Sequence, residues 1–382
     1  MSIFKKTLSC AVLAALGTCA LAGCGRHDTP NEAATSASPE ASAAITETVS
    51  ESTAASEQTP APDAPGIQSA NPADKTSTPF GQHGALHVEN GKLTDADGNI
   101  VQLYGMSTHG IAWFPQYINY DSFRTLRDDW NTNCIRLAMY TAEYGGYCAG
   151  GDKEQLKQLV RDGVSYATEL GMYVIVDWHI LSDCDPNQNK DEAIAFFREM
   201  SEAFADNDNV LYEICNEPNS GTSWDSIKSY AEEVIPVIRE QKPDAVILVG
   251  TPTWSQEIDK AAASPLTFDN IMYTLHFYAG THKDDLRNRL ETCAQNNLPV
   301  FVSEFGMCDA SGNGANDFDS TTKWLDLLNK YQISFCCWNL ANKDESSSVF
   351  KAASTALFDW TDEDFNESGR WIRDYFRGMP QK

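Results

Sequence analysis

Short apolar segments alternate with amphipathic segments along most of this 382-residue sequence. Nearly continuous apolar runs of six to eight residues are typical of parallel strands that are buried on both faces. Eight such runs are present, at 101–106, 134–140, 172–179, 210–217, 245–250, 271–278, 299–306 and 333–340. Helical patterns lie between them and after the last one. Eight β/α units in about 300 residues predict an α/β fold, the (β/α)8 TIM barrel.

Two further patterns bear on this fold. Residues 87–101, HVENGKLTDADGNIV, carry the turn signals Asn90-Gly91 and Asp97-Gly98. They predict a small N-terminal β-hairpin ahead of the barrel. A doubly wound open sheet is the structural alternative, but no glycine-rich phosphate loop follows the first predicted strand.

The N-terminal 23 residues are expected to be a signal peptide. Lys5 and Lys6 precede a short apolar run, as in export signals. Leu21-Ala22-Gly23-Cys24 resembles the lipobox of bacterial lipoproteins, which implies cleavage before Cys24 and lipidation of its thiol. An ordinary signal peptide cut nearby is the alternative. The expected location is extracytoplasmic, lipid-anchored to a bacterial membrane or cell surface, with the anchor as the only membrane contact.

The segment that follows has a composition unlike the rest of the chain. Residues 25–79 contain no Phe, Trp or Tyr and consist mainly of Ala, Ser, Thr, Pro and Glu. Such a segment cannot bury enough apolar surface to offset its chain entropy. Residues 24–79 are therefore expected to be the lipidated cysteine followed by a disordered tether. Residues 80–382 are expected to be a (β/α)8 catalytic domain, acting as a monomer.

Charge and cysteine usage restrict the partners. A net charge of -26 repels phosphate backbones, so no nucleic-acid partner is expected. No CxxC motif or Cys/His zinc spacing is present, and no metal is expected. Cysteines in strand-like runs are interpreted as buried free thiols: Cys134, Cys215, Cys336 and Cys337. Cys148 and Cys184 fall in predicted loops and could pair in an oxidising compartment.

Polar and aromatic side chains gather at the carboxyl ends of the predicted strands, the end that forms the active face of such barrels. These residues are His109, Arg136, Tyr140, His179, Asn216, Glu217, His276, Tyr278, Glu304 and Trp338. Two carboxylates on one face, Glu217 and Glu304, predict glycoside hydrolysis, which needs an acid and a second, ionised carboxylate. Arg136, His276 and Tyr278 would keep one of them ionised, and its charge would raise the pKa of the other.

Two charged residues inside apolar runs need a structural explanation. A lone buried guanidinium is too costly, so Arg136 is expected to have a carboxylate partner. Glu213 lies within the run 210–217 and is interpreted as a structural ion pair.

In these residues and the motifs around them, the chain resembles glycoside hydrolase family 5, and within it the bacterial endo-β-1,4-glucanases. The resemblance covers residues 84 to about 350, through GMSTHGIAWF, IRLAMYTAEYGGY, VDWHILSD, YEICNEPN, YTLHFYAGTHK, FVSEFG and CWNLANKDESS. It implies that Glu217 is the acid/base and Glu304 the nucleophile. It implies supporting roles for Arg136, His179, Asn216, His276 and Tyr278. It also implies substrate-binding positions at His109, Trp113, Tyr140, Trp254, Trp338, Lys343 and Glu345.

The resemblance carries details as well. Asn216 would bond the sugar 2-hydroxyl, and Trp338 would lie under the sugar at the cleavage point, followed by a cis peptide bond. Two positions depart from the family pattern: Ala112 stands where Gln is usual, and Asn342 where Asp is usual. Both departures concern substrate affinity rather than the catalytic pair.

Together these observations predict a retaining endo-β-1,4-glucanase acting on β-glucan without a cofactor, with the two carboxylates about 5–5.5 Å apart. Mixed-linkage β-glucanase, mannanase and xylanase activities remain open, because subsite contacts decide specificity. A metal-dependent hydrolase using His109, His179 and His276 is a rival from another class, to be separated by its sensitivity to chelator. A non-catalytic glycan-binding surface lipoprotein is a third, and it would bind sugar without turnover.

Overall fold

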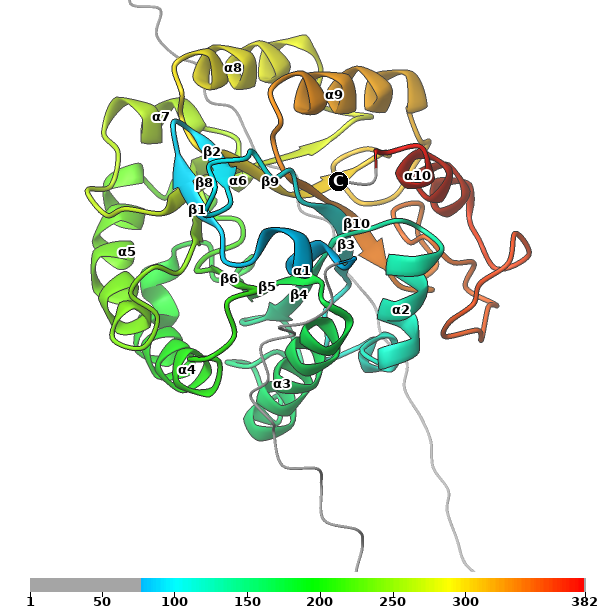
Figure 1. Cartoon of the computed structure of the whole chain (residues 1–382), viewed down its shortest axis with the longest axis horizontal. Helices are drawn as coiled ribbons and strands as arrows, with labels where there is room; N and C mark the ends of the chain where they lie inside the picture. The colour runs from blue at the N-terminus through cyan, green and yellow to red at the C-terminus, as the bar shows by residue number, and fades with distance from the viewer. Residues whose placement is uncertain (1–76, 381–382) are drawn as a thin grey trace, which may run out of the picture. The chain divides into compact units, whose positions relative to one another are not determined.

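The computed structural model describes residues 77–380, and its central feature is a closed barrel of eight parallel strands (Figure 1). The strand order is β10-β3-β4-β5-β6-β7-β8-β9, so consecutive strands are neighbours. The predicted (β/α)8 barrel is confirmed, and the open-sheet alternative is wrong. The strands are β3 (Tyr104–Thr108), β4 (Cys134–Tyr140), β5 (Tyr173–His179), β6 (Val210–Glu213), β7 (Ile247–Val249), β8 (Ile271–Tyr278), β9 (Val300–Gly306) and β10 (Phe335–Leu340).

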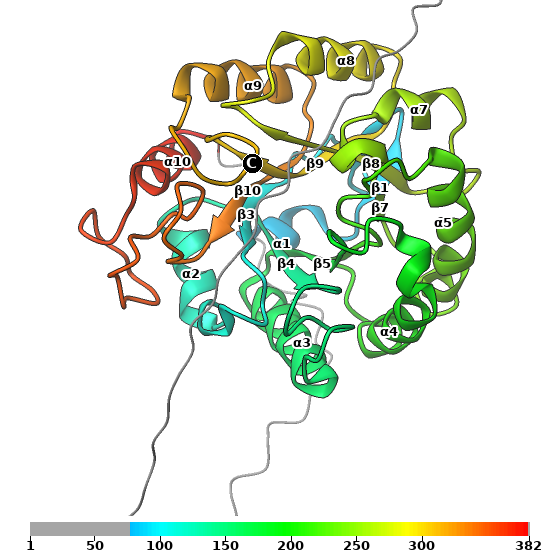
Figure 2. The same ribbon diagram turned by 180° about the vertical axis from the view of Figure 1, so that it is seen from behind.

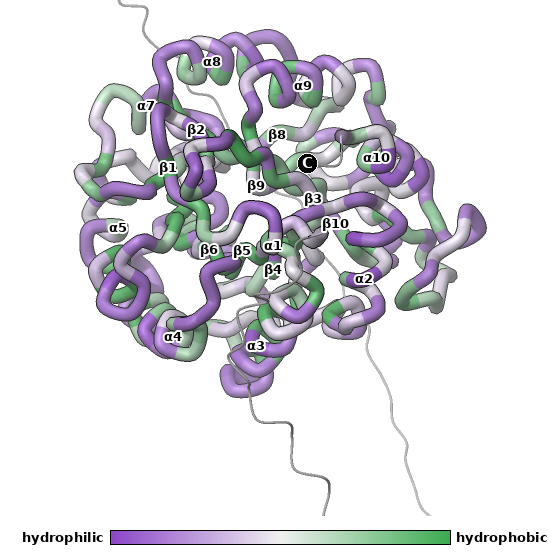
Figure 3. Tube along the Cα trace, viewed as in Figure 1, coloured by the Kyte–Doolittle hydropathy of each residue, from purple (hydrophilic) through white to green (hydrophobic). Residues whose placement is uncertain are grey.

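Helices surround the barrel and connect its strands (Figure 2). They bury one face and turn the opposite, mainly hydrophilic face outward (Figure 3). Asp152, for example, caps α3 (Lys153–Leu170), the longest helix of the described residues, and Gly171 ends it at φ 67°. The α-helices are α2 (Tyr120–Asp128), α3 (Lys153–Leu170), α4 (Lys190–Ala203), α5 (Trp224–Arg239), α6 (Pro252–Ser255), α7 (Ile258–Ala263), α8 (Asp284–Gln295), α9 (Phe318–Lys330) and α10 (Glu367–Arg377), with short 3-10 turns η1 (Pro115–Tyr117) and η2 (Pro186–Asn189).

The predicted hairpin is present as β1 (His87–Glu89) and β2 (Lys92–Thr94), which pair antiparallel. Its turn places Asn90 and Gly91 at φ 50° and 76°, the left-handed values that two-residue hairpin turns require. With helix α1 (Pro79–His83), the hairpin lies over one end of the barrel (Figure 1). There Phe80, Leu86 and Leu93 join a buried apolar cluster with Cys134 and Tyr173 from the amino ends of β4 and β5. The hairpin therefore closes the amino-terminal end of the barrel.

The fourth barrel strand is shorter than its apolar run indicates. The predicted strand 210–217 ends at Glu213 as β6. Beyond it the backbone turns toward the end of β5, where the N–H groups of Asn216 and Glu217 donate to the carbonyls of Trp178 and Ile180. Glu217 therefore lies in the loop after β6 rather than at the last position of the strand. These hydrogen bonds are made to another segment of the chain, so the residue pattern within 210–217 does not predict them.

The N-terminal predictions fall mostly outside the described residues. The signal peptide 1–23, Cys24 and tether residues 24–76 lie there. Of the predicted tether, residues 77–79 are described, and Pro79 is the first residue of α1. Within 77–380, no helix has both the length and the apolar composition to cross a bilayer.

The cysteines of the described region are all free. Cys134, Cys215, Cys336 and Cys337 are buried, as their strand-like surroundings predict. Cys148 and Cys184 are partly exposed and are not joined to each other in this structure.

Candidate active site

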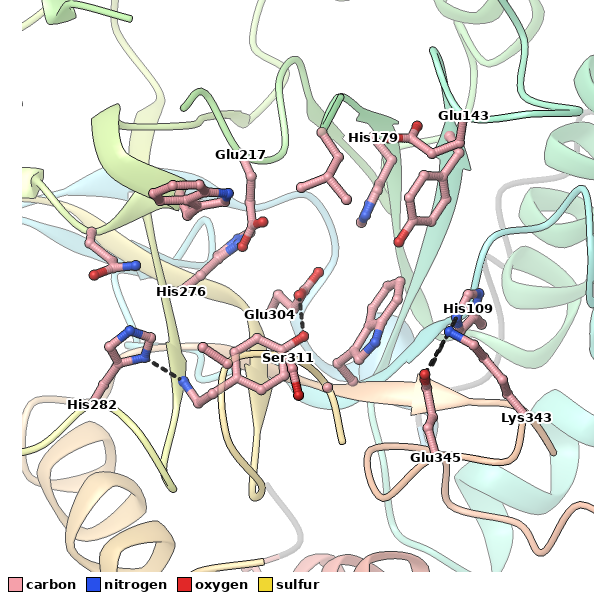
Figure 4. Close-up of a pocket in the computed structure, with 18 of the residues that line it drawn as sticks. His109, Glu143, His179, Glu217, His276, His282, Glu304, Ser311, Lys343 and Glu345 are labelled. Carbon is pink, nitrogen blue, oxygen red and sulfur yellow. Dashed lines mark hydrogen bonds and ion pairs between the residues drawn. The ribbon is translucent and has the colours of Figure 1, made fainter. Parts of the chain in front are cut away.

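A cavity of about 730 Å³ opens at the carboxyl ends of the barrel strands (Figure 4). Most of the predicted site residues line it. They are His109, Trp113, Tyr140, His179, Glu217, Trp254, His276, Tyr278, Glu304, Trp338, Lys343 and Glu345. The remaining two, Arg136 and Asn216, are buried beneath them. The fold therefore assembles in one cleft residues that the sequence spreads over more than 200 positions.

Glu217 and Glu304 face each other in the middle of this cleft (Figure 4). A carboxylate oxygen of Glu217 lies within 4.8 Å of one from Glu304, and a nitrogen of His276 lies within the same distance of both. Glu304 comes from β9, and His276 from the adjacent strand β8. Both carboxylates are largely buried, with 9% and 4% of the residue exposed. A sugar bound between them would contact both.

The surroundings of Glu304 favour its ionised form. Burial alone would raise its pKa, but the positive charges of His276 and Arg136 outweigh that effect and lower the pKa. Arg136 Nη1 donates to Glu304 Oε2 at 3.1 Å, and the Tyr278 hydroxyl donates to Oε1 at 2.8 Å. An ionised carboxylate held in a fixed orientation is what a nucleophile at this position requires.

The surroundings of Glu217 favour its protonated form. Burial raises its pKa, His276 partly opposes this, and the charge of Glu304 adds to the increase. His276 Nδ1 lies 3.0 Å from Glu217 Oε1, and its Nε2 lies 2.9 Å from Ser303 Oγ. Burial lowers the pKa of His276, but hydrogen bonds to Glu213 and Glu217 raise it to about 9. The pKa values of two neighbouring carboxyl groups are thus shifted in opposite directions, as an acid and a nucleophile require.

Arg136 is fully buried and holds the carboxylates below the cleft in place. Its Nε donates to Glu213 Oε2 at 2.7 Å, its Nη2 lies 3.0 Å from Asp177 Oδ2, and its Nη1 reaches Glu304. Burial would raise the pKa of Glu213, but Arg136 and His276 lower it to about 2. The predicted carboxylate partner of Arg136 and the predicted ion pair of Glu213 are confirmed.

His179 and Asn216 form a fixed polar layer beside this guanidinium. Burial and the Arg136 charge lower the pKa of His179 to about 3, so its ring is neutral. His179 Nδ1 donates to Asp177 Oδ2 at 2.6 Å, and its Nε2 accepts from Asn216 Nδ2 at 3.2 Å. Asn216 Nδ2 also donates to the Ile180 carbonyl. Both amide hydrogens are therefore engaged inside the protein, and the contact of Asn216 with a sugar hydroxyl stays a prediction.

An aromatic wall continues from the carboxylates along one side of the cleft. The Trp338 ring lies 5.3 Å from His179 and 5.1 Å from His109 between centroids. Tyr140 and Trp113 extend the row, with centroids 4.7 Å apart. The Trp338–Asn339 peptide bond is cis, as the resemblance implies. Flat apolar surfaces of this kind suit the C–H faces of a pyranose ring.

Charged residues also line this end of the cleft. Lys343 Nζ lies 2.6 Å from Glu345 Oε2, and Glu345 Oε1 lies 3.7 Å from His109 Nε2. His109, Lys343 and Glu345 lie together, away from His282 at the other end (Figure 4). The cleft therefore offers polar groups on both sides of the carboxylate pair.

Sequence reasoning missed several residues of this site. Asp177 is visible in the sequence at the end of the same predicted strand as His179, two positions earlier and so on the same face, but the sequence assigned it no role. Ser303 bridges His276 and Glu213 from inside an apolar strand, and its small side chain gives no signal. Others line the cleft from loops and helix ends, where no periodicity marks them, among them Glu143, Gln256, His282 and Ser311.

The histidines of the metal-dependent alternative do not meet as a ligand set. His179 binds Asp177 and Asn216, and His109 Nδ1 accepts from its neighbour's backbone N–H. Within the described region, the residues close enough to share an ion are Glu217, His276 and Glu304. Both nitrogens of His276 already have partners. The geometry therefore gives no support to a site built from His109, His179 and His276.

Comparison with known families assigns the chain to one of them. Residues 94–344 match the pattern of the cellulase family, glycosyl hydrolase family 5. The chain belongs to this family. The resemblance seen in the sequence is confirmed, and the match contains both Glu217 and Glu304.

Named relatives of this family 5 hydrolase are bacterial endoglucanases. The chain is 51% identical over 295 residues to endoglucanase A of Butyrivibrio fibrisolvens, covering 76% of this chain and 68% of the relative. It is 46% identical over 304 residues to an endoglucanase of Clostridium saccharobutylicum, covering 79% and 66%. The chain thus spans about two thirds of the length of these relatives.

Solved structures of endoglucanases are also similar to this chain. The family 5 hydrolase superposes on the catalytic domain of Thermobifida fusca endoglucanase Cel5A, crystallised as a variant with cellotetraose, with a TM-score of 0.75. The two are 42% identical, and the match covers 79% of this chain and 100% of the other. A β-glucanase of Saccharophagus degradans, at 20% identity and a TM-score of 0.64, shares the fold.

Proposed function

We propose that this chain is a retaining endo-β-1,4-glucanase that hydrolyses internal bonds of β-1,4-linked glucan. The observation that carries the proposal is the carboxyl pair: Glu217 and Glu304 lie within 4.8 Å with pKa values shifted in opposite directions. A separation near 5 Å is typical of retaining glycosidases, whereas inverting enzymes need about 6.5–9.5 Å to admit a water molecule.

The first chemical step forms a covalent intermediate. Glu304 attacks the anomeric carbon, and the bond from that carbon to the glycosidic oxygen breaks. Glu217 gives its proton to the departing oxygen, which leaves as a sugar hydroxyl. The product of this step is an α-glycosyl ester of Glu304.

The second step releases the sugar. Glu217, now ionised, takes a proton from water, and the water oxygen attacks the anomeric carbon. The ester bond to Glu304 breaks, which restores the carboxylate and yields a product with the original β configuration. Apart from the substrate, Glu217, Glu304 and water supply every group and proton that these two steps need.

Groups on both sides of the reacting centre support an endo-acting mode. Trp254 lines the cleft on the side of the Glu217 loop, where its backbone N–H donates to the Pro218 carbonyl. Trp113 and Lys343 line the opposite part. A polymer bound through sugars on both sides of the scissile bond is cut internally. The relatives named as endoglucanases support the same substrate class.

Sugar release by the purified protein tests this function. Soluble cellulose derivative, mixed-linkage glucan, xylan and mannan would each be incubated with the enzyme, with chelator present. We expect rapid cleavage of the β-1,4-glucans and a fall in viscosity that precedes most of the reducing-sugar release. Cleavage of only mannan or xylan would keep the mechanism and overturn the substrate. Binding without cleavage would favour a sugar-binding scaffold, and loss of activity with chelator a metal-dependent hydrolase.

The pH profile tests the assigned protonation states. Below about pH 9 His276 is positively charged, and its charge favours the ionised forms of Glu217 and Glu304. Its replacement, His276→Asn, removes that charge and therefore raises the pKa of both carboxyl groups. We expect both limbs of the kcat/KM profile to move to higher pH, by about one unit.

His87→Asn, a change in the hairpin at the opposite end of the barrel, is the matched control and should leave the profile in place. A His276→Asn profile that moves to lower pH, or does not move, would contradict the assignment.

A further inference from the structure

One aromatic side chain beside the cleft has no role in the function proposed above. Tyr144 lies in the loop after β4 and is 94% exposed. The other exposed large hydrophobic residues between 77 and 380 are 37–45% exposed: Ile100, Trp254 and Phe358. A phenol ring that is almost wholly in water gains nothing from burial in the folded protein. Its position relative to the cleft therefore bears on what it binds.

The backbone that carries this ring is firmly held. The Tyr144 carbonyl accepts a hydrogen bond from Trp113 Nε1 at 3.0 Å. Next to it, the Glu143 carboxylate accepts from the backbone N–H and the hydroxyl of Ser182, at 2.8 and 2.7 Å. The loop is thus tied to the cleft wall on one side and to the loop after β5 on the other. The exposed ring projects from a fixed backbone position.

Both neighbours that hold Tyr144 line the cleft. Trp113 and Glu143 are part of its wall, and Figure 4 shows Glu143 near His179, away from His282. Tyr144 therefore lies just outside the end of the cleft that holds the aromatic row Trp338, Tyr140 and Trp113. Trp254, the other exposed aromatic of the cleft, belongs to the opposite end.

We infer that Tyr144 forms an outer sugar-binding site, which extends the cleft beyond Trp113. This inference rests on the proposed function, since the ligand is a further pyranose unit of the same β-1,4-linked chain. Equatorial hydroxyls leave the two faces of such a ring lined with C–H groups, which stack on an aromatic ring. Only a substrate that extends past the units held within the cleft reaches Tyr144. The site therefore determines preference for chain length.

The test compares a long and a short substrate on the same variant. Cellohexaose is long enough to reach the outer site, whereas the two sugars of a nitrophenyl cellobioside are held within the cleft. For each variant, kcat/KM on cellohexaose is divided by kcat/KM on the cellobioside. This ratio is independent of the fraction of active enzyme. An aromatic contact of about 0.5–1.5 kcal/mol corresponds to a factor of about 2–12. We expect Tyr144→Ala to lower the ratio by this factor, through a higher KM for cellohexaose.

Matched variants separate stacking from other effects. Tyr144→Phe keeps the ring without its hydroxyl and should keep the wild-type ratio. Phe358→Ala removes an exposed aromatic that does not line the cleft, and its ratio should also match wild type. An unchanged ratio in Tyr144→Ala, including one that results from an equal loss on both substrates, would overturn the outer site. Failure of the wild-type enzyme to cleave either substrate would instead overturn the proposed function.

Discussion

Glu304→Gln is expected to abolish turnover of β-1,4-glucan while the barrel stays folded. An amide oxygen is a poor nucleophile and carries no charge to stabilise the developing cation. We therefore expect kcat to fall by at least about 10⁴-fold, in line with the loss of other enzymic nucleophiles. Initial rates on cellohexaose, at enzyme concentrations high enough to detect the residual activity, measure the effect.

The contacts of Glu304 explain why the fold should survive this change. Arg136 keeps Glu213 and Asp177 as partners, so no buried charge is left unpaired. The oxygen of the introduced side-chain amide can accept from Arg136, and the Tyr278 hydroxyl can accept from its NH₂ group. The unfolding midpoint should therefore stay within a few degrees of wild type. Glu169→Gln, at an exposed carboxylate of α3 that does not line the cleft, is the control and should keep most of the activity.

A smaller side chain at the same position tests the role more directly. Glu304→Ala leaves room for a small anion, and azide can then attack the anomeric carbon of an aryl cellobioside from the same face. Turnover should return with azide and give the α-glycosyl azide, because a single displacement inverts the configuration. Near-normal activity without azide would remove Glu304 from the mechanism.

The barrel was predictable because each buried strand is marked by an apolar run in its own sequence. β4 and β8 coincide with their apolar runs at 134–140 and 271–278, since a strand that is buried on both faces is apolar along its whole length. β6 was overestimated by four residues, because the apolar run continues into a loop that bonds to β5. The boundary was set by a partner strand, which the run itself does not encode.

The catalytic pair was also predictable, whereas much of its support was not. Glu217 and Glu304 are charged residues at the ends of apolar runs, which a packed core would reject. Arg136 indicated a carboxylate partner for the same reason. Glu143, by contrast, lines the cleft from a loop whose course depends on Trp113 and Ser182. No spacing along the sequence reports such long-range contacts.

Glu217→Ala should show a defect that depends on the leaving group. A sugar alcohol must be protonated as it departs, so loss of the acid should lower kcat/KM on cellohexaose by about 10²–10⁴-fold. A dinitrophenyl group leaves readily without a proton, so the first step on its cellobioside should change little. The glycosyl-enzyme then accumulates because no base activates water. A burst of dinitrophenol followed by a slow steady state measures this difference.

Azide assigns the two carboxyl groups to opposite roles. In Glu217→Ala azide attacks the glycosyl ester of Glu304, and this second inversion gives the β-glycosyl azide. Glu304→Ala should instead give the α-glycosyl azide. Because the two variants should give opposite anomers, each serves as the control for the other. The alkaline limb of the pH profile should also disappear in Glu217→Ala, since the raised pKa of Glu217 sets that limb. The same anomer from both variants, or an equal loss on both leaving groups, would show that Glu217 is not the acid. Because burial and the charge of Glu304 raise the pKa of Glu217, its role as the acid depends on the nucleophile beside it.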